Sequence, residues 1–327
     1  MDEGEIVRLL SANCHSGRKP YVVFSDFLDM TEAALDAMPR HLENARDHGR
    51  PADDTPEVAD LWKRLRDEYK TEDFQRFKSA FHILSALSVD RAQGWGNDTG
   101  NEKTLDVIGR TYEMFQQANP FSGQYFTPWA LALAMARMLA NGGGESIEGA
   151  LRRMGLDALR KMRDVDPIAA ALCDSAVTVA TLDESLFVTH VVPLMSAYVD
   201  PVTYNDPACG SGVMLLAGAV CWPRWACDWG WVRFTGQDTD RQCVQMARIN
   251  LMLYGLNGFS LRLRMAAGGA SPHVVHAEQS ISPAGPVVGP GGGDENRVSA
   301  RSDGAKNAGM SIRYQQSTLF DEGGNHE

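Results

Sequence analysis

Two short stretches place glycines and carboxylates where a small ligand could meet main-chain N–H groups. The first, residues 205–212, reads Asn-Asp-Pro-Ala-Cys-Gly-Ser-Gly; it follows the apolar run 198–204 and precedes Val-Met-Leu-Leu at 213–216. This order predicts a strand, a tight turn and a helix. Gly210 and Gly212 would let a ligand approach the main chain, and the helix start would point free N–H groups at that ligand.

The second stretch, Trp231–Asp240, begins 19 residues after Gly212 and is predicted to be the next parallel strand, ending in carboxylates. In dinucleotide-binding folds an acid about 20 residues past the glycine turn holds ribose hydroxyls, and Asp238 is placed for that role. Residues 241–254 then have the apolar spacing of a helix. The alternation of strands and helices predicts an α/β domain.

These stretches resemble the S-adenosylmethionine-binding half of adenine-N6 DNA methyltransferases, and within them the modification subunit of type I restriction systems. The motifs are Gly-Gln-Tyr-Phe-Thr-Pro at 123–128, Asp-Pro-Ala-Cys-Gly-Ser-Gly at 206–212, Gly-Gln-Asp-Thr-Asp at 236–240, and Ala-Arg-Ile-Asn-Leu-Met-Leu-Tyr-Gly at 247–255. The resemblance covers 120–258 and implies a Rossmann-like doubly wound sheet, S-adenosylmethionine as cofactor, and methyl transfer to adenine N6 in DNA.

The resemblance also implies a set of cofactor contacts. They are Gln124, Tyr125, Thr127 and Pro128 in the first motif, and Asp206, Ala208, Gly210, Ser211, Gly212 and Asp238 around the glycine turn and the second strand. Thr127 has a second interpretation as the N-cap of a helix over 129–139, with Pro128 at the first helical position. Both interpretations of Thr127 remain open at this point.

The catalytic tetrapeptide of that family, Asn/Asp/Ser-Pro-Pro-aromatic, does not occur in the 327 residues; Asn119-Pro120-Phe121 has one proline and is predicted to be a turn. Adenine N6 is a poor nucleophile. In the family the tetrapeptide accepts its hydrogens and stacks a ring on the flipped base. No catalytic residue is therefore assigned. An active DNA methyltransferase, a cofactor-binding but inactive accessory or anti-restriction protein, and an S-adenosylmethionine-dependent enzyme with another substrate all remain open.

Composition restricts the class further. The net charge of −11 argues against non-specific coating of DNA, but leaves a local patch or a partner subunit as routes to DNA. The chain has no apolar run of 18 residues and starts with acidic residues, so neither a membrane span nor a secretory signal is expected and a cytoplasmic location is predicted. The six cysteines have no zinc-like spacing and are predicted to be reduced thiols, with no metal site.

The chain divides into three predicted regions: a helical region over 1–118, the methyltransferase-like domain over 119–266, and a disordered Gly/Pro/Ser-rich tail over 267–327. After Gly255 only one further strand, Ser260–Met265, is predicted, so the sheet is expected to be truncated. Its first strand would then be an exposed apolar edge. This predicts pairing with a second protein or with a second copy of the chain.

Three smaller features carry expectations of their own. The tail residues Gln316, Leu319 and Phe320 resemble the short peptide that docks bacterial proteins onto the DNA sliding clamp. Four of the seven tryptophans lie in 222–231; they form either a stacking surface for a base or a segment packed under the sheet, and packing is preferred. His190, which lies among valines, is expected in the core.

Overall fold

The computed structural model describes residues 2–15, 18–95, 103–118, 126–142, 144–178, 187–256 and 258–262. These residues belong to one compact unit that spans 1–281, and the second unit, 282–327, lies outside the described part. Gln124 and Tyr125 also lie outside it, as does the peptide of Gln316, Leu319 and Phe320. Their roles remain predictions.

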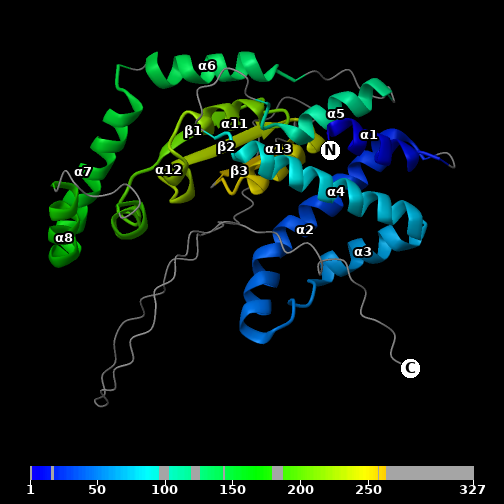
Figure 1. The fold of residues 1–327 in the computed structure, drawn as a ribbon, viewed down its shortest axis with the longest axis horizontal. Coiled ribbons are helices and arrows are strands. Elements are labelled where there is room, and N and C mark those ends of the chain that lie inside the picture. Colours follow the sequence, from blue (N-terminus) through cyan, green and yellow to red (C-terminus); the bar gives the residue numbers. More distant parts are fainter. Residues whose placement is uncertain are drawn as a thin grey trace, which may run out of the picture. The chain divides into compact units, whose positions relative to one another are not determined.

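Three strands form a parallel sheet in the order β1-β2-β3 in the described part of the chain (Figure 1). They are β1 (Val202–Asp206), β2 (Val232–Asp238) and β3 (Gly258–Arg262). In the register of the sheet, Asp206 lies opposite Gly236 and Asp238 lies opposite Arg262. The carboxyl ends of neighbouring strands therefore meet at one edge, as expected for the predicted site.

Three helices lie between the strands in the sequence and form the crossover connections that parallel strands need. They are α11 (Val213–Val220), α12 (Arg224–Asp228) and α13 (Arg241–Leu253). Helix α11 lies very close to β1, since a Cβ at Gly218 would be 2.9 Å from Cδ1 of Tyr204. Helix α13 packs on β2 and β3. This order, β1-α11-α12-β2-α13-β3, places the glycine turn and Asp238 on consecutive strand ends.

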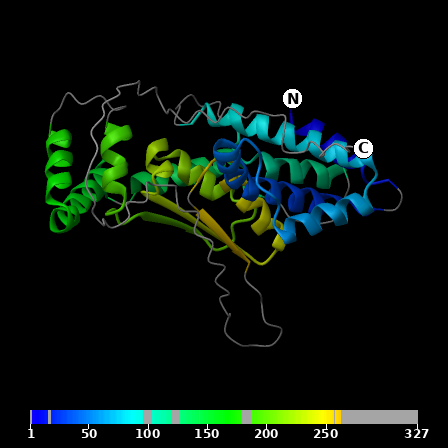
Figure 2. The same cartoon turned by 90° about the horizontal axis from the view of Figure 1, so that it is seen from below.

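One face of the sheet carries the core and the other is open in the described residues. Phe234 is fully buried, whereas Thr203, Asn205 and Arg233, which alternate with half-buried positions in β1 and buried positions in β2, are exposed. Figure 2 shows the strands, coloured yellow-green to orange, with helices along one side of them. Parallel sheets are normally covered on both faces. The doubly wound architecture therefore stays a prediction.

The helical N-terminal residues pack directly on the strand-bearing part. Their helices are α1 (Glu3–Ala12), α2 (Pro20–His48), α3 (Pro56–Glu68), α4 (Thr71–Ala92) and α5 (Val107–Ala118). Helix α2 runs along α13, and Glu32 pairs with Arg248 at 2.7 Å and accepts a hydrogen bond from Gln245 at 2.7 Å. Charged contacts of this kind fix the register between two helices.

The remaining helices lie between α5 and β1 in the sequence. They are α6 (Trp129–Gly142), α7 (Ile147–Val165), α8 (Pro167–Thr178), the π-helical turn η1 (Phe187–Val191) and α10 (Val192–Ser196). Helix α6 packs through Ala132 and Ala136 on α11. Its other face exposes Leu131, Met135, Met138 and Leu139.

Two local expectations are decided by burial. The tryptophan segment packs rather than presenting a stacking surface: Trp222 and Trp231 are 5% and 2% exposed, and the Trp231 indole N–H donates to Ser196 Oγ at 2.8 Å. His190 is exposed, so the expected core histidine was wrong. The π-helical turn directs Val191 inward, and His190 one position earlier faces solvent.

Candidate functional site

The glycine turn after β1 has the backbone geometry that its sequence demands. Gly210 and Gly212 have φ of 52° and 88°, in the left-handed region that side chains with a Cβ rarely adopt. The main-chain N–H of Ala208 donates to Asp206 Oδ1 at 3.1 Å, which closes the start of the turn. A Cβ at Gly212 would lie 3.2 Å from Cβ of Ala247, so this glycine also lets α13 approach the turn.

Asp238 joins the end of β2 to that turn. Its Oδ2 accepts the main-chain N–H of Gly210 at 2.9 Å, and its Oδ1 accepts that of Asp240 at 2.9 Å. A further main-chain bond runs from Cys209 N–H to Gln237 O at 2.8 Å. The carboxylate therefore fixes the turn and still has lone pairs for hydroxyl donors from a ligand.

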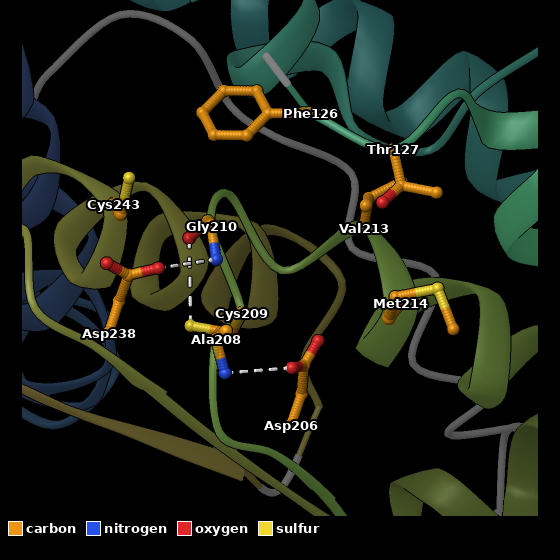
Figure 3. A pocket seen from close by; sticks show the side chains of 10 residues that line it. All are labelled: Phe126, Thr127, Asp206, Ala208, Cys209, Gly210, Val213, Met214, Asp238 and Cys243. Atoms are coloured by element: carbon orange, nitrogen blue, oxygen red, sulfur yellow. Dashed lines mark hydrogen bonds between the residues drawn. The ribbon is translucent and has the colours of Figure 1, made fainter. Parts of the chain in front are cut away.

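A cavity of about 210 Å³ opens at this point (Figure 3). It is lined by Phe126, Thr127, Asp206, Ala208, Cys209, Gly210, Val213, Met214, Asp238 and Cys243. In Figure 3 the ring of Phe126 and the two carboxylates lie on different sides of the glycine turn. The start of α11 also contributes, so the cavity combines carboxylates, apolar groups and the N–H groups of a helix start.

Burial disfavours the thiolate form of both cysteines that line the cavity. Burial raises the pKa of the Cys209 thiol to about 12, with the nearby charge of Asp206 as a further cause. Burial also raises the pKa of Cys243, and Asp238 raises it further. Only thiolates are reactive. Cys209 and Cys243 therefore act as small apolar wall groups, and the carboxylates set the cavity's preference for cations and hydroxyl donors.

The structure brings together half of the predicted cofactor contacts. Thr127, Asp206, Ala208, Gly210 and Asp238 line the cavity, whereas Pro128, Ser211 and Gly212 do not. The carbonyl of Pro128 accepts the first hydrogen bonds of α6, from Leu131 and Ala132 at 3.0 Å each, so Pro128 rather than Thr127 holds the N-cap position. Thr127 precedes the helix and faces the cavity.

Ser211 belongs to a buried network behind the turn. Its hydroxyl donates to Asp106 Oδ2, and its carbonyl accepts from Asn250 Nδ2 at 2.8 Å. Asn250 Nδ2 also donates to Asp106 Oδ1 at 2.7 Å, and the Gly109 N–H donates to the same oxygen at 2.8 Å. Ser211 is fully buried, which differs from the expected role as a cofactor contact.

The sequence analysis missed Asp106 and Phe126. Phe126 stands within the first motif but is not among the predicted contacts. For Asp106 there was an indirect signal: Asn250 is a polar residue on the buried side of α13, Tyr254 follows at its C-cap, and buried polar groups need partners. Both find theirs next to α5, since the Tyr254 hydroxyl donates to Leu105 O at 2.6 Å.

Asp106 makes stability depend on pH. Burial raises its pKa from 3.8 to about 6, although three hydrogen-bond donors act in the opposite direction. Because the folded pKa is the higher one, the contribution of Asp106 to stability is present below about pH 4 and is lost as the pH rises through 6. The neighbouring charge of Glu113 acts in the same direction as burial.

We expect Asp106→Asn to match the parent protein at about pH 4 and to be more stable above pH 6, by on the order of 1–3 kcal/mol. The amide keeps an acceptor for Gly109 and Asn250 and can donate to Ser211 Oγ. Urea unfolding at both pH values checks this, with Asp90→Asn, an exposed acid that pairs with Lys103 at 3.7 Å, as the control. An equal difference at both pH values would contradict it.

Comparison with known families gives one result. Residues 187–280 match the family model of N-6 DNA methylase. The match contains β1, the glycine turn, β2, α13 and β3, which together build most of the cavity. It supports a relationship of this segment to the adenine-N6 DNA methyltransferases, a class that acts on DNA. No curated protein and no solved structure matches the chain.

No described helix combines the length and the apolar character needed to cross a membrane. Within the same residues, no group of three or more His, Cys, Asp or Glu side chains is arranged to hold a metal ion.

Proposed function

We propose that the chain binds S-adenosylmethionine in the cavity at the ends of β1 and β2 and takes part in methyl transfer to adenine N6 in DNA, as a protein of the type I modification-subunit kind. The observation that carries this proposal is the pair of carboxylates, Asp206 and Asp238, beside a left-handed glycine turn within the segment that matches N-6 DNA methylase. The proposal includes a methyltransferase-like doubly wound sheet and a cytoplasmic location.

The residues present fit this cofactor. At Gly210 a Cβ would lie 2.9 Å from Cδ1 of Phe126, so only bare main chain fits between the ring and the cavity. Asp238 would accept ribose hydroxyls, and the carboxylate of Asp206 complements a cationic group. Thr127 and the start of α11 can serve the amino-acid end, where a carboxylate needs N–H or O–H donors.

The bound cofactor would supply an electrophilic methyl group on a positively charged sulfonium. The chain's own contribution is to place it: Asp238 holds the turn and the ribose, and Phe126 covers Gly210. Activation of the adenine amino group needs acceptors such as those of the family's tetrapeptide, which does not occur in the 327 residues. No catalytic residue is assigned.

Incorporation of labelled methyl groups tests the activity. If the chain is an active methyltransferase, the purified chain incubated with unmodified DNA and methyl-labelled S-adenosylmethionine yields N6-methyladenine, identified after digestion to nucleosides. Asp238→Ala should lower the label strongly when the cofactor concentration is near the dissociation constant of the parent chain, because it removes the proposed ribose acceptor. Label in protein or RNA instead of DNA would favour an S-adenosylmethionine-dependent enzyme with another substrate, the last of the three possibilities that the sequence left open.

A second candidate function is a cofactor-binding accessory protein that acts through a partner. It is favoured by the missing tetrapeptide and by β1, which pairs only with β2 among the described residues and leaves Thr203 and Asn205 exposed. The unpaired main-chain groups along this edge could pair with another strand. Cofactor binding without DNA methylation, together with dimers or complexes in light scattering, would favour this candidate. A monomer that methylates DNA alone would exclude it.

A further inference from the structure

Helix α5 contacts both walls of the cavity from behind, although none of its own residues lines it. Asp106, the residue before its first turn, bonds to the glycine turn, and Glu113, seven residues later, bonds to the segment that carries Phe126. Residues seven apart lie on the same side of a helix. One face of α5 therefore reaches two segments that are far apart in the sequence.

The Asp106 contact fixes the middle residue of the turn. Ser211 lies between Gly210 and Gly212, the two glycines with positive φ, in a turn that the Gly212 N–H closes by donating to Cys209 O at 2.7 Å. Asp106 accepts from the Ser211 hydroxyl, and Asn250 donates to the Ser211 carbonyl at 2.8 Å. The side chain and the main chain of Ser211 are thus both held from outside the turn.

The Glu113 contact fixes the opposite wall. Its Oε1 accepts the main-chain N–H of Phe126 at 3.1 Å, and the ring of the adjacent Tyr112 lies 5.6 Å from the ring of Phe126. The Phe126 ring in turn lies over Gly210. The distance between the aromatic wall and the glycine wall is therefore set by α5.

We infer that Asp106 and Glu113 are positioning residues of the ligand cavity: through Ser211 and through the Phe126 N–H they hold its two walls at the spacing that the ligand needs, without touching the ligand. This inference rests on the proposed function for the identity of that ligand. It gives residues of the helical N-terminal region a role in shaping the cavity.

Glu113 offers the sharper test because it is partly exposed, so its removal costs little folding stability. In calorimetric titrations of the full chain with S-adenosylmethionine, Glu113→Ala is expected to weaken binding about fivefold to tenfold, the effect of one lost hydrogen bond. Glu113→Gln keeps an acceptor and is expected to restore the affinity to within about twofold. The melting temperature of the ligand-free variants should stay within about 2 °C of the parent.

The matched control is Glu145→Ala. Glu145 is an exposed acid that precedes α7, and it pairs with Arg153 of that helix at 3.0 Å. Glu145 does not line the cavity, so its loss should leave the affinity for S-adenosylmethionine unchanged. For the other wall, Asp106→Asn is expected to keep the affinity within about twofold and Asp106→Ala to weaken it more than about tenfold. If Asp106→Ala does not fold, the comparison of Glu113→Ala with Glu113→Gln tests the inference on its own.

The outcomes separate this inference from the proposed function. If the parent chain binds and Glu113→Ala binds equally well, the inference is overturned while the proposed function stands. A fall in affinity that Glu113→Gln does not restore, or one that follows a lowered melting temperature, also overturns it. If the parent chain shows no binding, the proposed function fails and the inference fails with it.

Discussion

Replacing Gly109 by alanine is expected to lower the free energy of unfolding by about 3 kcal/mol or more, the range seen when a core is overpacked. Gly109 is the third residue of α5, and a Cβ there would overlap both Asp106 Oδ2 and Ser211 Oγ. All three groups are buried in one network, so no side chain can swing into solvent to make room. The added methyl group must displace the glycine turn or α5.

The chain offers a matched control for this substitution. Gly149 is the third residue of α7, and its N–H is capped by Ser146 Oγ at 3.1 Å, just as Gly109 is capped by Asp106. A Cβ at Gly149 would meet only the side chains of Glu145 and Ser146, at 3.2 Å and 3.3 Å, at an exposed helix start. Gly149→Ala should be neutral or stabilising by up to about 1 kcal/mol.

Chemical unfolding of the two variants checks this prediction. Gly109→Ala should unfold at a clearly lower denaturant concentration than the parent, and Gly149→Ala at the same or a higher one. If both variants are as stable as the parent, the network of Asp106, Ser211 and Asn250 is not packed as described. Its role as the support of the turn would then be lost.

Replacing Asp238 by alanine is expected to reduce the affinity for S-adenosylmethionine by about 100-fold or more, on the order of 3 kcal/mol. The substitution removes two effects at once. The main-chain N–H of Gly210 loses its acceptor, which frees the turn, and the ribose hydroxyls lose theirs. Asp238→Asn keeps one acceptor oxygen and should fall between the parent and Asp238→Ala.

Equilibrium binding with labelled cofactor measures these differences. Asp228→Ala is the control, because Asp228 is an acid near the surface that pairs with Arg224 at 2.7 Å and does not line the cavity. Its affinity should equal that of the parent. Equal affinities for Asp238→Ala and Asp228→Ala would show that the carboxylate at the end of β2 plays no part in binding.

The parts of the site that the sequence predicted are those set by local constraints. A glycine with positive φ, an acid at the end of a strand and the spacing to the next strand are visible in a few consecutive residues, and Gly210, Asp206 and Asp238 were found in this way. Strand β1 begins at Val202, four residues after the start of the apolar run 198–204 that predicted it. The residues before Val202 continue the short turn after α10, where the Tyr198 N–H donates to Met195 O at 2.9 Å.

The parts that the sequence did not predict depend on contacts between distant segments. Asp106 meets Ser211, 105 positions away, and Asn250, 144 positions away, and neither distance leaves a periodic signal. Cys243 lines the cavity only because α13 packs beside the turn at Gly212. Ser211 was assigned to the ligand on its place in a motif, and the direction of its side chain is decided by Asp106.

The most direct test of the account is a calorimetric titration of the purified full chain with S-adenosylmethionine, repeated with S-adenosylhomocysteine. The account predicts saturable binding of both compounds at one site per chain, in competition with each other. No detectable binding of either compound by the folded chain would contradict the assignment of the cavity between Phe126, Gly210 and Asp238.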